Sequence, residues 1–261
     1  MPTLVWDEFH FQDPDGGKII FWPHIPCIRM PVKLRSHSNF DGVAFLTSSI
    51  DIQSWIIEEK QEKESPGVHR DSAIASGTVL GRLMTDLNEL DVDGPVIPDP
   101  DQLRLLLHAK NSRVGLPIYA IEPNLEDEKW VEWQIESADQ QVTYSNLILT
   151  LTTGRRWKKI RKSAIKSVTS SKFVNADLGA ASASCLTWWI EEQRGISDEL
   201  KKLRDERFVS RLRGALENLR NKENSNSEET TLMVPIHQAW LPSIRKAISS
   251  CTNVEEITPE E

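Results

Sequence analysis

Residues 142–176 read VTYSNLILTLTTGRRWKKIRKSAIKSVTSSKFVNA. The first part, from Val142 to Leu151, is an extended apolar run that predicts a β-strand. The whole stretch holds eight Lys or Arg residues and no Asp or Glu, in a chain with a formal net charge of −8. Cations gathered in this way indicate an anionic partner such as nucleic acid, phosphate or a membrane. A solvated turn and helix face would explain the same pattern.

The segments on either side of this strand differ in how clearly they can be interpreted. Residues 130–135 alternate between apolar and polar side chains, and a turn at residues 138–141 joins them to the run from Val142. This arrangement predicts a β-hairpin. Residues 155–168 are ambiguous, because their apolar side chains recur at helical spacing while the Thr-Thr-Gly turn before them suits another strand.

The remaining pattern predicts an α+β fold: a twisted, mainly antiparallel sheet with helices packed on it and a helical C-terminal subregion. Three prolines, Pro23, Pro26 and Pro31, argue against a helix or a central strand in that part of the chain. The expected organisation is a sheet domain (1–176), a helical subregion of the same domain (177–251) and an acidic tail (252–261). Further strands are predicted at residues 19–22, 43–46, 115–121 and 232–236, and helices at 99–109 (with Asp99 as N-cap), 177–194, 197–221 and 242–250.

Composition points to an ordinary globular protein. The chain has 261 residues, of which 39% are hydrophobic and 27% charged, and it contains no apolar run of about 18 residues that would predict a membrane-spanning helix. The N-terminus carries acidic residues where a signal peptide needs an apolar core, so secretion is not expected. Three widely spaced cysteines predict reduced thiols in a cytosol.

The chain shows no recognisable catalytic motif. Its six histidines stand singly, and G-x-S-x-G, P-loop and GxGxxG patterns are absent. A nuclease interpretation would combine Asp99 or Asp101 with Glu132, but Gln134 stands where such a site needs a lysine. We therefore expect no catalytic residues, no metal site and no cofactor, and no enzymatic activity.

Four stretches stand in the order DPDGGKIIFWPHI (13–25), FDGVAFLTSSIDIQSWI (40–56), DQLRLLLHAKNSRVGLPIYAIEP (101–123) and WKKIRKSAIKSVTSSKFV (157–174). Taken together in this order, they resemble the pore-forming domain of gasdermins. The similarity covers roughly residues 10–170. Residues 177–251 match no pattern of that family, and the cysteine that bacterial members acylate near the N-terminus is missing. A short chain without the family's large repressor domain is similar to the fungal regulator-of-cell-death allorecognition proteins.

This resemblance implies a cytoplasmic protein that moves to the plasma membrane on activation. There it would oligomerise on anionic phospholipid, with itself or with a related variant, and insert β-hairpins to cause regulated cell death. The implied membrane anchor consists of Trp22, Ile25, Ile28 and Met30. The implied lipid-binding residues are Arg155, Arg156, Lys158, Lys159, Arg29, Lys33 and Arg35.

Two other functions use the same features. The cations of residues 155–172 could bind nucleic acid while Trp157 stacks on bases. Nucleic acid is the less favoured partner, because acids balance the cations elsewhere and the whole chain is acidic. Alternatively, the protein is an adaptor that contacts a partner through the predicted helix 197–221.

Overall fold

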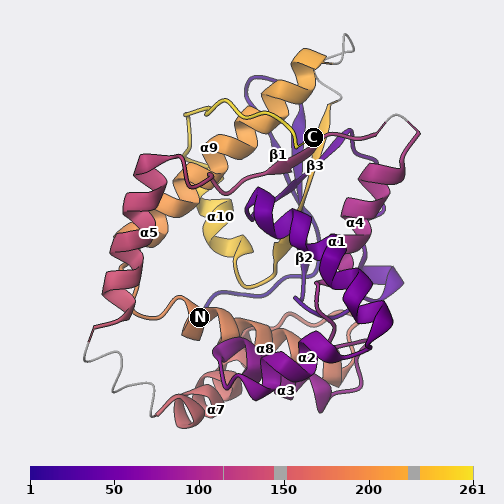
Figure 1. Cartoon of the computed structure of the whole chain (residues 1–261), viewed down its shortest axis with the longest axis vertical. Coiled ribbons are helices and arrows are strands. Elements are labelled where there is room, and N and C mark those ends of the chain that lie inside the picture. Colours follow the sequence, from indigo (N-terminus) through magenta and orange to yellow (C-terminus); the bar gives the residue numbers. More distant parts are fainter. Residues whose placement is uncertain (114, 144–151, 223–229, 261) are drawn as a thin grey trace.

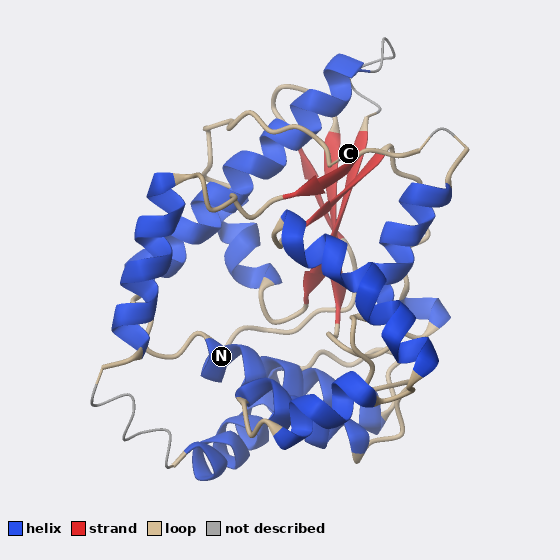
Figure 2. Ribbon diagram, viewed as in Figure 1, coloured by secondary structure: helices blue, strands red, loops and turns tan. Residues whose placement is uncertain are grey.

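The computed structural model describes residues 1–113, 115–143, 152–222 and 230–260. In these residues, nine α-helices surround a five-stranded sheet (Figures 1 and 2). None of these helices combines the length and the apolarity needed to cross a membrane. The strands are β1 (Phe9–Gln12), β2 (Lys18–His24), β3 (Gly42–Phe45), β4 (Ile118–Ala120) and β5 (Thr231–His237). The helices are α1 (Ser49–Glu64), α2 (Val68–Ala75), α3 (Val79–Asn88), α4 (Pro100–Asn111), α5 (Glu128–Gln141), α7 (Thr153–Ala164), α8 (Ala176–Glu192), α9 (Asp198–Lys222) and α10 (Leu241–Ile248).

The sheet is mixed and mostly parallel. The order of its described strands is β1-β2-β5-β3-β4, and among them only the β1–β2 pair is antiparallel. The predicted mainly antiparallel sheet is therefore wrong, and the fold is α/β. Side-chain alternation indicates where a strand lies but not which way it runs. The direction is set by long helical connections, such as α1 to α4 between β3 and β4, which parallel neighbours require.

The C-terminal part of the chain contributes to the middle of the sheet. Helices α8 and α9 confirm the two predicted long helices. The strand that follows them, β5, lies between β2 and β3 and pairs with β2 from Thr231 opposite Lys18 to His237 opposite His24. Residues 177–251, expected to form a helical subregion, therefore supply a central strand as well.

Helices cover both faces of the sheet, and the alternation of β2 shows how. Ile20 and Trp22 point into a core formed with α3, α4 and α8, whereas Ile19 and Phe21 point into a second core formed with α9 and α10. All four side chains are fully buried, which agrees with the continuous apolar runs typical of strands covered on both faces. In Figure 1, α2, α3, α7 and α8 gather at one end of the sheet.

The predicted hairpin over residues 130–151 is contradicted in its first half. Residues 130–135 lie in α5, which Asp127 caps by accepting the backbone N–H of Trp130 at 2.9 Å. Trp130 and Trp133 stack with ring centroids 4.6 Å apart, because residues three apart share a helix face. The bulky residues at alternate positions suggest a strand, although Trp130 and Trp133 also have the three-residue spacing of one helix face. Residues 144–151, most of the second half, lie outside the described residues.

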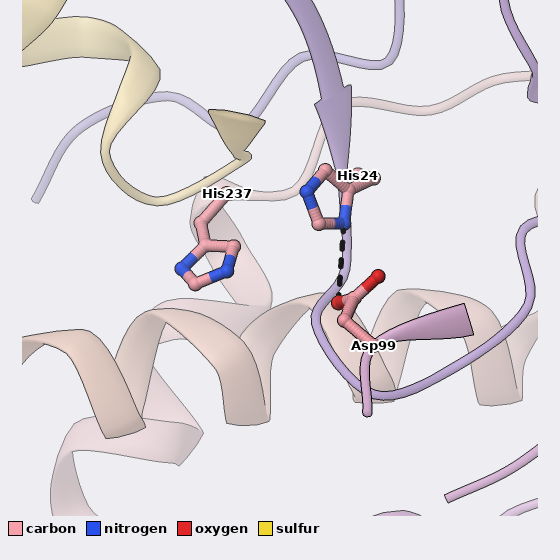
Figure 3. A group of neighbouring side chains, drawn as sticks. All are labelled: His24, Asp99 and His237. Carbon is pink, nitrogen blue, oxygen red and sulfur yellow. Dashed lines mark ion pairs between the residues drawn. The ribbon is translucent and has the colours of Figure 1, made fainter. Parts of the chain in front are cut away.

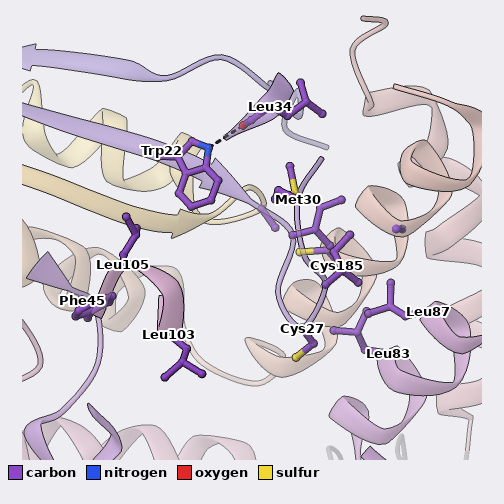
Figure 4. Close-up of a cluster of buried hydrophobic side chains, with 14 of the residues drawn as sticks. Trp22, Cys27, Met30, Leu34, Phe45, Leu83, Leu87, Leu103, Leu105 and Cys185 are labelled. Atoms are coloured by element: carbon purple, nitrogen blue, oxygen red, sulfur yellow. Dashed lines mark hydrogen bonds between the residues drawn. The ribbon is translucent and has the colours of Figure 1, made fainter. Parts of the chain in front are cut away.

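The residues expected to form a membrane anchor are buried instead. Trp22, Ile25, Ile28 and Met30 have no exposed surface. Trp22 and Met30 belong to the core shown in Figure 4, where the Trp22 indole N–H donates to the carbonyl of Leu34 at 2.9 Å. Most apolar side chains of residues 25–35, which we call the Pro-rich loop, therefore pack beneath the loop, and membrane anchoring would require it to leave the core.

Strand β2 contains Pro23, although the prolines of this region are expected to exclude a central strand. The prolines predict no central strand in this region, yet β2 continues through Pro23 to His24. Strand β1 pairs with β2 only as far as Phe21. Pro23 thus lies where β2 has a neighbour on one side only, and a missing N–H is best tolerated at such a position.

The acidic C-terminal residues pack on the fold. The carboxylate of Glu255 lies 2.9 Å from Arg211 and 3.3 Å from Arg207, two residues of α9. Ile257 is buried, and the backbone N–H of Glu260 donates to the carbonyl of Ile118 at 2.7 Å. The segment expected to be an acidic tail is, as far as residue 260, bound along α9 and β4.

This packing leaves no space for a side chain at Gly214 of α9. A Cβ atom there would lie 1.8 Å from the backbone carbonyl oxygen of Glu255. We expect Gly214→Ala to lower the free energy of unfolding by about 1–3 kcal/mol, as overpacking does. At Gly179 of α8 a Cβ would meet nothing within 4 Å, so Gly179→Ala is the matched control. It should raise stability by about 0.5–1 kcal/mol through helix propensity. Urea denaturation of both variants tests this, and equal effects would contradict it.

Candidate functional site

Two histidines meet at the carboxyl end of the parallel sheet. Each is the last residue of an apolar strand, His24 after IIFWP in β2 and His237 after LMVPI in β5. The strands are adjacent and in register, so the two side chains lie on the same face, with ring centroids 5.3 Å apart. The carboxyl ends of parallel strands are where open α/β sheets bind ligands.

Asp99 completes the group (Figure 3). Its predicted role as the N-cap of α4 is confirmed, since Oδ1 accepts the backbone N–H groups of Asp101 and Gln102 at 3.1 and 3.0 Å. The other oxygen, Oδ2, accepts the N–H of Cys27 at 2.9 Å and lies 3.6 Å from His24 Nδ1. Cys27 has a left-handed backbone (φ 65°), uncommon for a residue with a side chain, and this turn follows directly after β2.

The three side chains form a compact polar cluster with unmet hydrogen-bonding capacity. One nitrogen from each imidazole and one oxygen of Asp99 lie within 4.8 Å of one another. The Nδ1 atoms of His24 and His237 are buried and have no hydrogen-bond partner among the described residues. The amide nitrogen of Gln102 lies 3.5 Å from Nε2 of each histidine. Because unpaired buried polar atoms cost about 1–3 kcal/mol each, this arrangement indicates a ligand site.

A pocket of about 250 Å³ opens onto this cluster. Most of its other lining residues are apolar or aromatic, and they come from the strand ends, α1, α3, α8 and the turn after β5. This volume admits a small molecule, with its polar part at His237, Asp99 and Gln102 and its apolar part against the aromatic rings. The lining includes Asp99, Gln102 and His237, with Pro26, Leu46, Trp55, Leu80, Trp188, Ile236 and Trp240.

Burial changes the protonation of two groups beside the pocket. Burial, and secondarily the charge of nearby His24, lowers the pKa of His237 to about 3, so its imidazole is neutral at neutral pH. Burial raises the pKa of Cys27, and the neighbouring Asp99 carboxylate raises it further. The Cys27 thiol therefore stays protonated, which argues against a cysteine nucleophile.

The basic residues expected to bind lipid lie on α7, away from this pocket. Arg155, Lys158 and Lys159 are exposed. Arg156 instead donates to both carboxylate oxygens of the buried Glu191, at 3.0 and 2.8 Å. These hydrogen bonds raise the pKa of Arg156. Three of the four predicted residues on α7 thus face solvent, and the fourth fastens α7 to α8.

The other three expected lipid-binding residues have separate surroundings. Arg29 is exposed 3.6 Å from Asp93, whereas Arg35 donates to the carbonyl of Met30 at 2.7 Å. The Lys33 ammonium lies 5.3 Å from the ring centroid of Phe173, and the Lys172 ammonium lies 4.8 Å from it. The Pro-rich loop and the end of the basic stretch therefore meet at Phe173. A pocket lies between these two segments, and its lining residues include Arg29, Val32, Arg35 and Phe173.

The residues of the nuclease interpretation do not come together. Asp101 is fully buried and accepts the backbone N–H of Met30 at 2.6 Å. Glu132 is exposed on α5, whose Trp130 belongs to the core on the other face of the sheet. Among these candidates only Asp99 lies at the pocket.

Sequence reasoning missed His24 and His237, which are 213 positions apart, although one signal was present. Both end an apolar strand of similar composition, IIFWPH and LMVPIH, and such ends meet when the strands are parallel neighbours. No protein-family model, curated protein or solved structure matches this chain.

Proposed function

We propose that the protein is an enzyme that activates water at the His24–Asp99–His237 cluster to hydrolyse a small, partly apolar substrate. The observation that carries this proposal is the meeting of two imidazoles and a carboxylate within 4.8 Å at a pocket. Imidazole and carboxylate groups placed together activate water for attack on an electrophilic carbon or phosphorus atom. The proposal departs from the expectation that the chain is not an enzyme.

The lining of the pocket supports the substrate class. Trp55, Trp188 and Trp240 come from three different segments and line one pocket with the imidazole of His237. Aromatic walls favour an apolar or aromatic group, and the few polar groups at the strand ends fix the orientation of the reacting bond. A pocket of about 250 Å³ suits a small molecule rather than a polymer segment.

The test is hydrolysis of a panel of 4-nitrophenyl carboxylic esters, anilides and phosphoesters with short apolar groups. We expect turnover of at least one class, and His237→Asn should lower kcat/KM by about 100-fold or more, because it removes one of the three groups that hold and orient the attacking water. His108→Asn is the matched control, because His108 is exposed on α4, and it should leave the rate unchanged. No turnover of any class, or equal rates for His237→Asn and the wild type, would contradict the proposal.

A second candidate function rests on the basic surface, which we define as Arg155, Lys158, Lys159, Lys162 and Lys166 of α7 and the turn after it. All five are exposed, and residues 152–176 contain no acid. Apolar side chains are exposed beside cations: Ile165 is 53% exposed beside Lys166, and Phe173 is 39% exposed beneath two lysines. We propose that this surface binds anionic phospholipid, because cations and exposed apolar groups together are typical of membrane-surface contacts.

Pore formation stays a prediction. The segments expected to insert as hairpins include α5, which is helical, and residues 144–151, which lie outside the described residues. Lipid binding by the basic surface requires neither segment to change, so it can be tested alone.

A further inference from the structure

The His24–Asp99–His237 cluster has the donor set of a transition-metal centre. We propose that it binds one divalent transition-metal ion, and zinc in particular. Two imidazole nitrogens and one carboxylate oxygen are the donors that zinc takes in sites that leave a fourth position for water. Calcium and magnesium prefer oxygen ligands, so a set with two imidazoles does not suit them.

The distances are close to those that an ion needs. Three ligand atoms about 2.1 Å from a tetrahedral ion lie about 3.4 Å from one another. Here His24 Nδ1 is 3.6 Å from Asp99 Oδ2, and all three donors lie within 4.8 Å. His24 is fully buried and stacked on Trp22, whereas His237 is partly exposed. Figure 3 shows that Nε2 of His237 faces His24 and Asp99, so Nε2 is the donor atom of this residue, and a small shift of the ring would bring it to the ion.

Gln102 is placed to orient His24. A metal-bound imidazole donates its other ring N–H to a neighbouring acceptor. The Gln102 amide lies 3.5 Å from Nε2 of both histidines. Turning the amide by 180° keeps its shape and exchanges nitrogen for oxygen. In that orientation Oε1 accepts from the Nε2–H group of His24, and the unpartnered Nδ1 of His24, which lies 3.6 Å from Asp99 Oδ2, is free to bind the ion.

The ion deepens the proposed function, and its chemical role rests on that function. A bound zinc ion lowers the pKa of a coordinated water, so that hydroxide forms at neutral pH. The hydroxide oxygen bonds to the electrophilic atom of the substrate, the bond to the leaving group breaks, and the leaving group departs with a proton supplied by water. No electron is gained or lost overall, so no further reactant is needed.

The experiment measures zinc and cobalt binding to the whole chain, produced without a polyhistidine tag and freed of metal with a chelator. We expect one equivalent of Zn²⁺ by calorimetry, a cobalt spectrum typical of low coordination number, and a higher melting temperature with zinc. His237→Gln should lose affinity by at least about 100-fold. Gln102→Leu should keep one equivalent with an affinity about 10–100-fold weaker, as expected for a positioning residue.

His10→Gln is the matched control. It removes a half-exposed histidine that lies 2.9 Å from Glu8, outside the proposed site, and it should leave zinc binding unchanged. Absence of stoichiometric zinc binding by the wild type would overturn the metal proposal. So would equal binding by a folded His237→Gln protein, or by Gln102→Leu if His237→Gln does not fold. Zinc binding without hydrolysis would support the metal site and contradict the proposed hydrolase function. Hydrolysis that persists with a chelator and without bound metal would support the hydrolase function and contradict the metal site.

Discussion

Arg213→Ala is expected to lower the free energy of unfolding by about 3–5 kcal/mol, the cost of removing one partner from a buried ion pair. Arg213 of α9 donates to both oxygens of Asp13, at 2.7 and 3.1 Å, and to Asp15 at 2.8 Å. The side chains of Arg213 and Asp13 are only 4% and 2% exposed. The substitution would leave the Asp13 carboxylate buried in the turn between β1 and β2, with Arg220 3.8 Å away.

The pKa of Asp13 determines how this loss of stability changes with pH. Burial alone would raise the pKa of Asp13, but hydrogen bonds from Arg213 and from the Asp15 N–H hold it below its ordinary value of 3.8. A carboxyl whose folded pKa is depressed contributes stability above its unfolded pKa and loses it as pH falls through the folded value. The difference in the free energy of unfolding between the wild type and Arg213→Ala should therefore be largest at pH 7, and it should become smaller below about pH 4.

Urea midpoints at pH 7 and pH 3.5 test both points. Lys202→Ala on the same helix is the control, because the Lys202 side chain is 73% exposed and exposed ion pairs contribute little. A loss below about 1 kcal/mol in Arg213→Ala, or a gap that widens at low pH, would contradict the prediction.

The triple variant Arg155→Glu, Lys158→Glu, Lys159→Glu is expected to weaken binding to anionic vesicles by more than about 100-fold. Each cation near an anionic membrane contributes about 1 kcal/mol, and reversal adds repulsion to that loss. Arg156 is left intact because it binds Glu191 inside the fold, and changing it would confuse stability with binding. Co-sedimentation with phosphatidylcholine vesicles, with and without phosphatidylserine, measures the effect.

The matched control reverses three exposed lysines elsewhere: Lys110→Glu, Lys129→Glu and Lys202→Glu. It changes the net charge by the same amount, so it separates a localised surface from a general effect of charge. Equal loss in both triple variants would indicate no specific surface. Salt-sensitive binding to nucleic acid with no binding to vesicles would instead favour the nucleic-acid interpretation.

The sequence by itself determined the local elements whose signals lie within a few residues. Asp99 before Pro100 predicts a helix start and is the N-cap, because a carboxylate satisfies free N–H groups wherever such a helix begins. The long apolar repeat of α9 and the apolar run of β5 were likewise predictable, because each element buries its own face. The basic character of α7 follows from composition alone.

Tertiary structure decided strand direction, the burial of the Pro-rich loop and the site. Residues 130–135 fit both a strand pattern and a helix pattern. In the folded protein they form a helix, in which the Trp133 indole N–H donates a hydrogen bond to the carbonyl of Leu200 at 2.9 Å. From the sequence, Trp22 and Met30 are expected to form an exposed anchor, but in the fold helices far along the chain cover them.

The site shows the same limit most clearly. His24 and His237 are two single histidines in the sequence, and only the parallel pairing of β2 with β5 brings them together. Asp99 joins them because Cys27, in the turn after β2, donates its N–H to the same carboxylate that caps α4. Local sequence fixes what each residue can do, but long-range pairing of strands and helices fixes which residues act together, because the contacts that hold them are made by segments far apart in the chain.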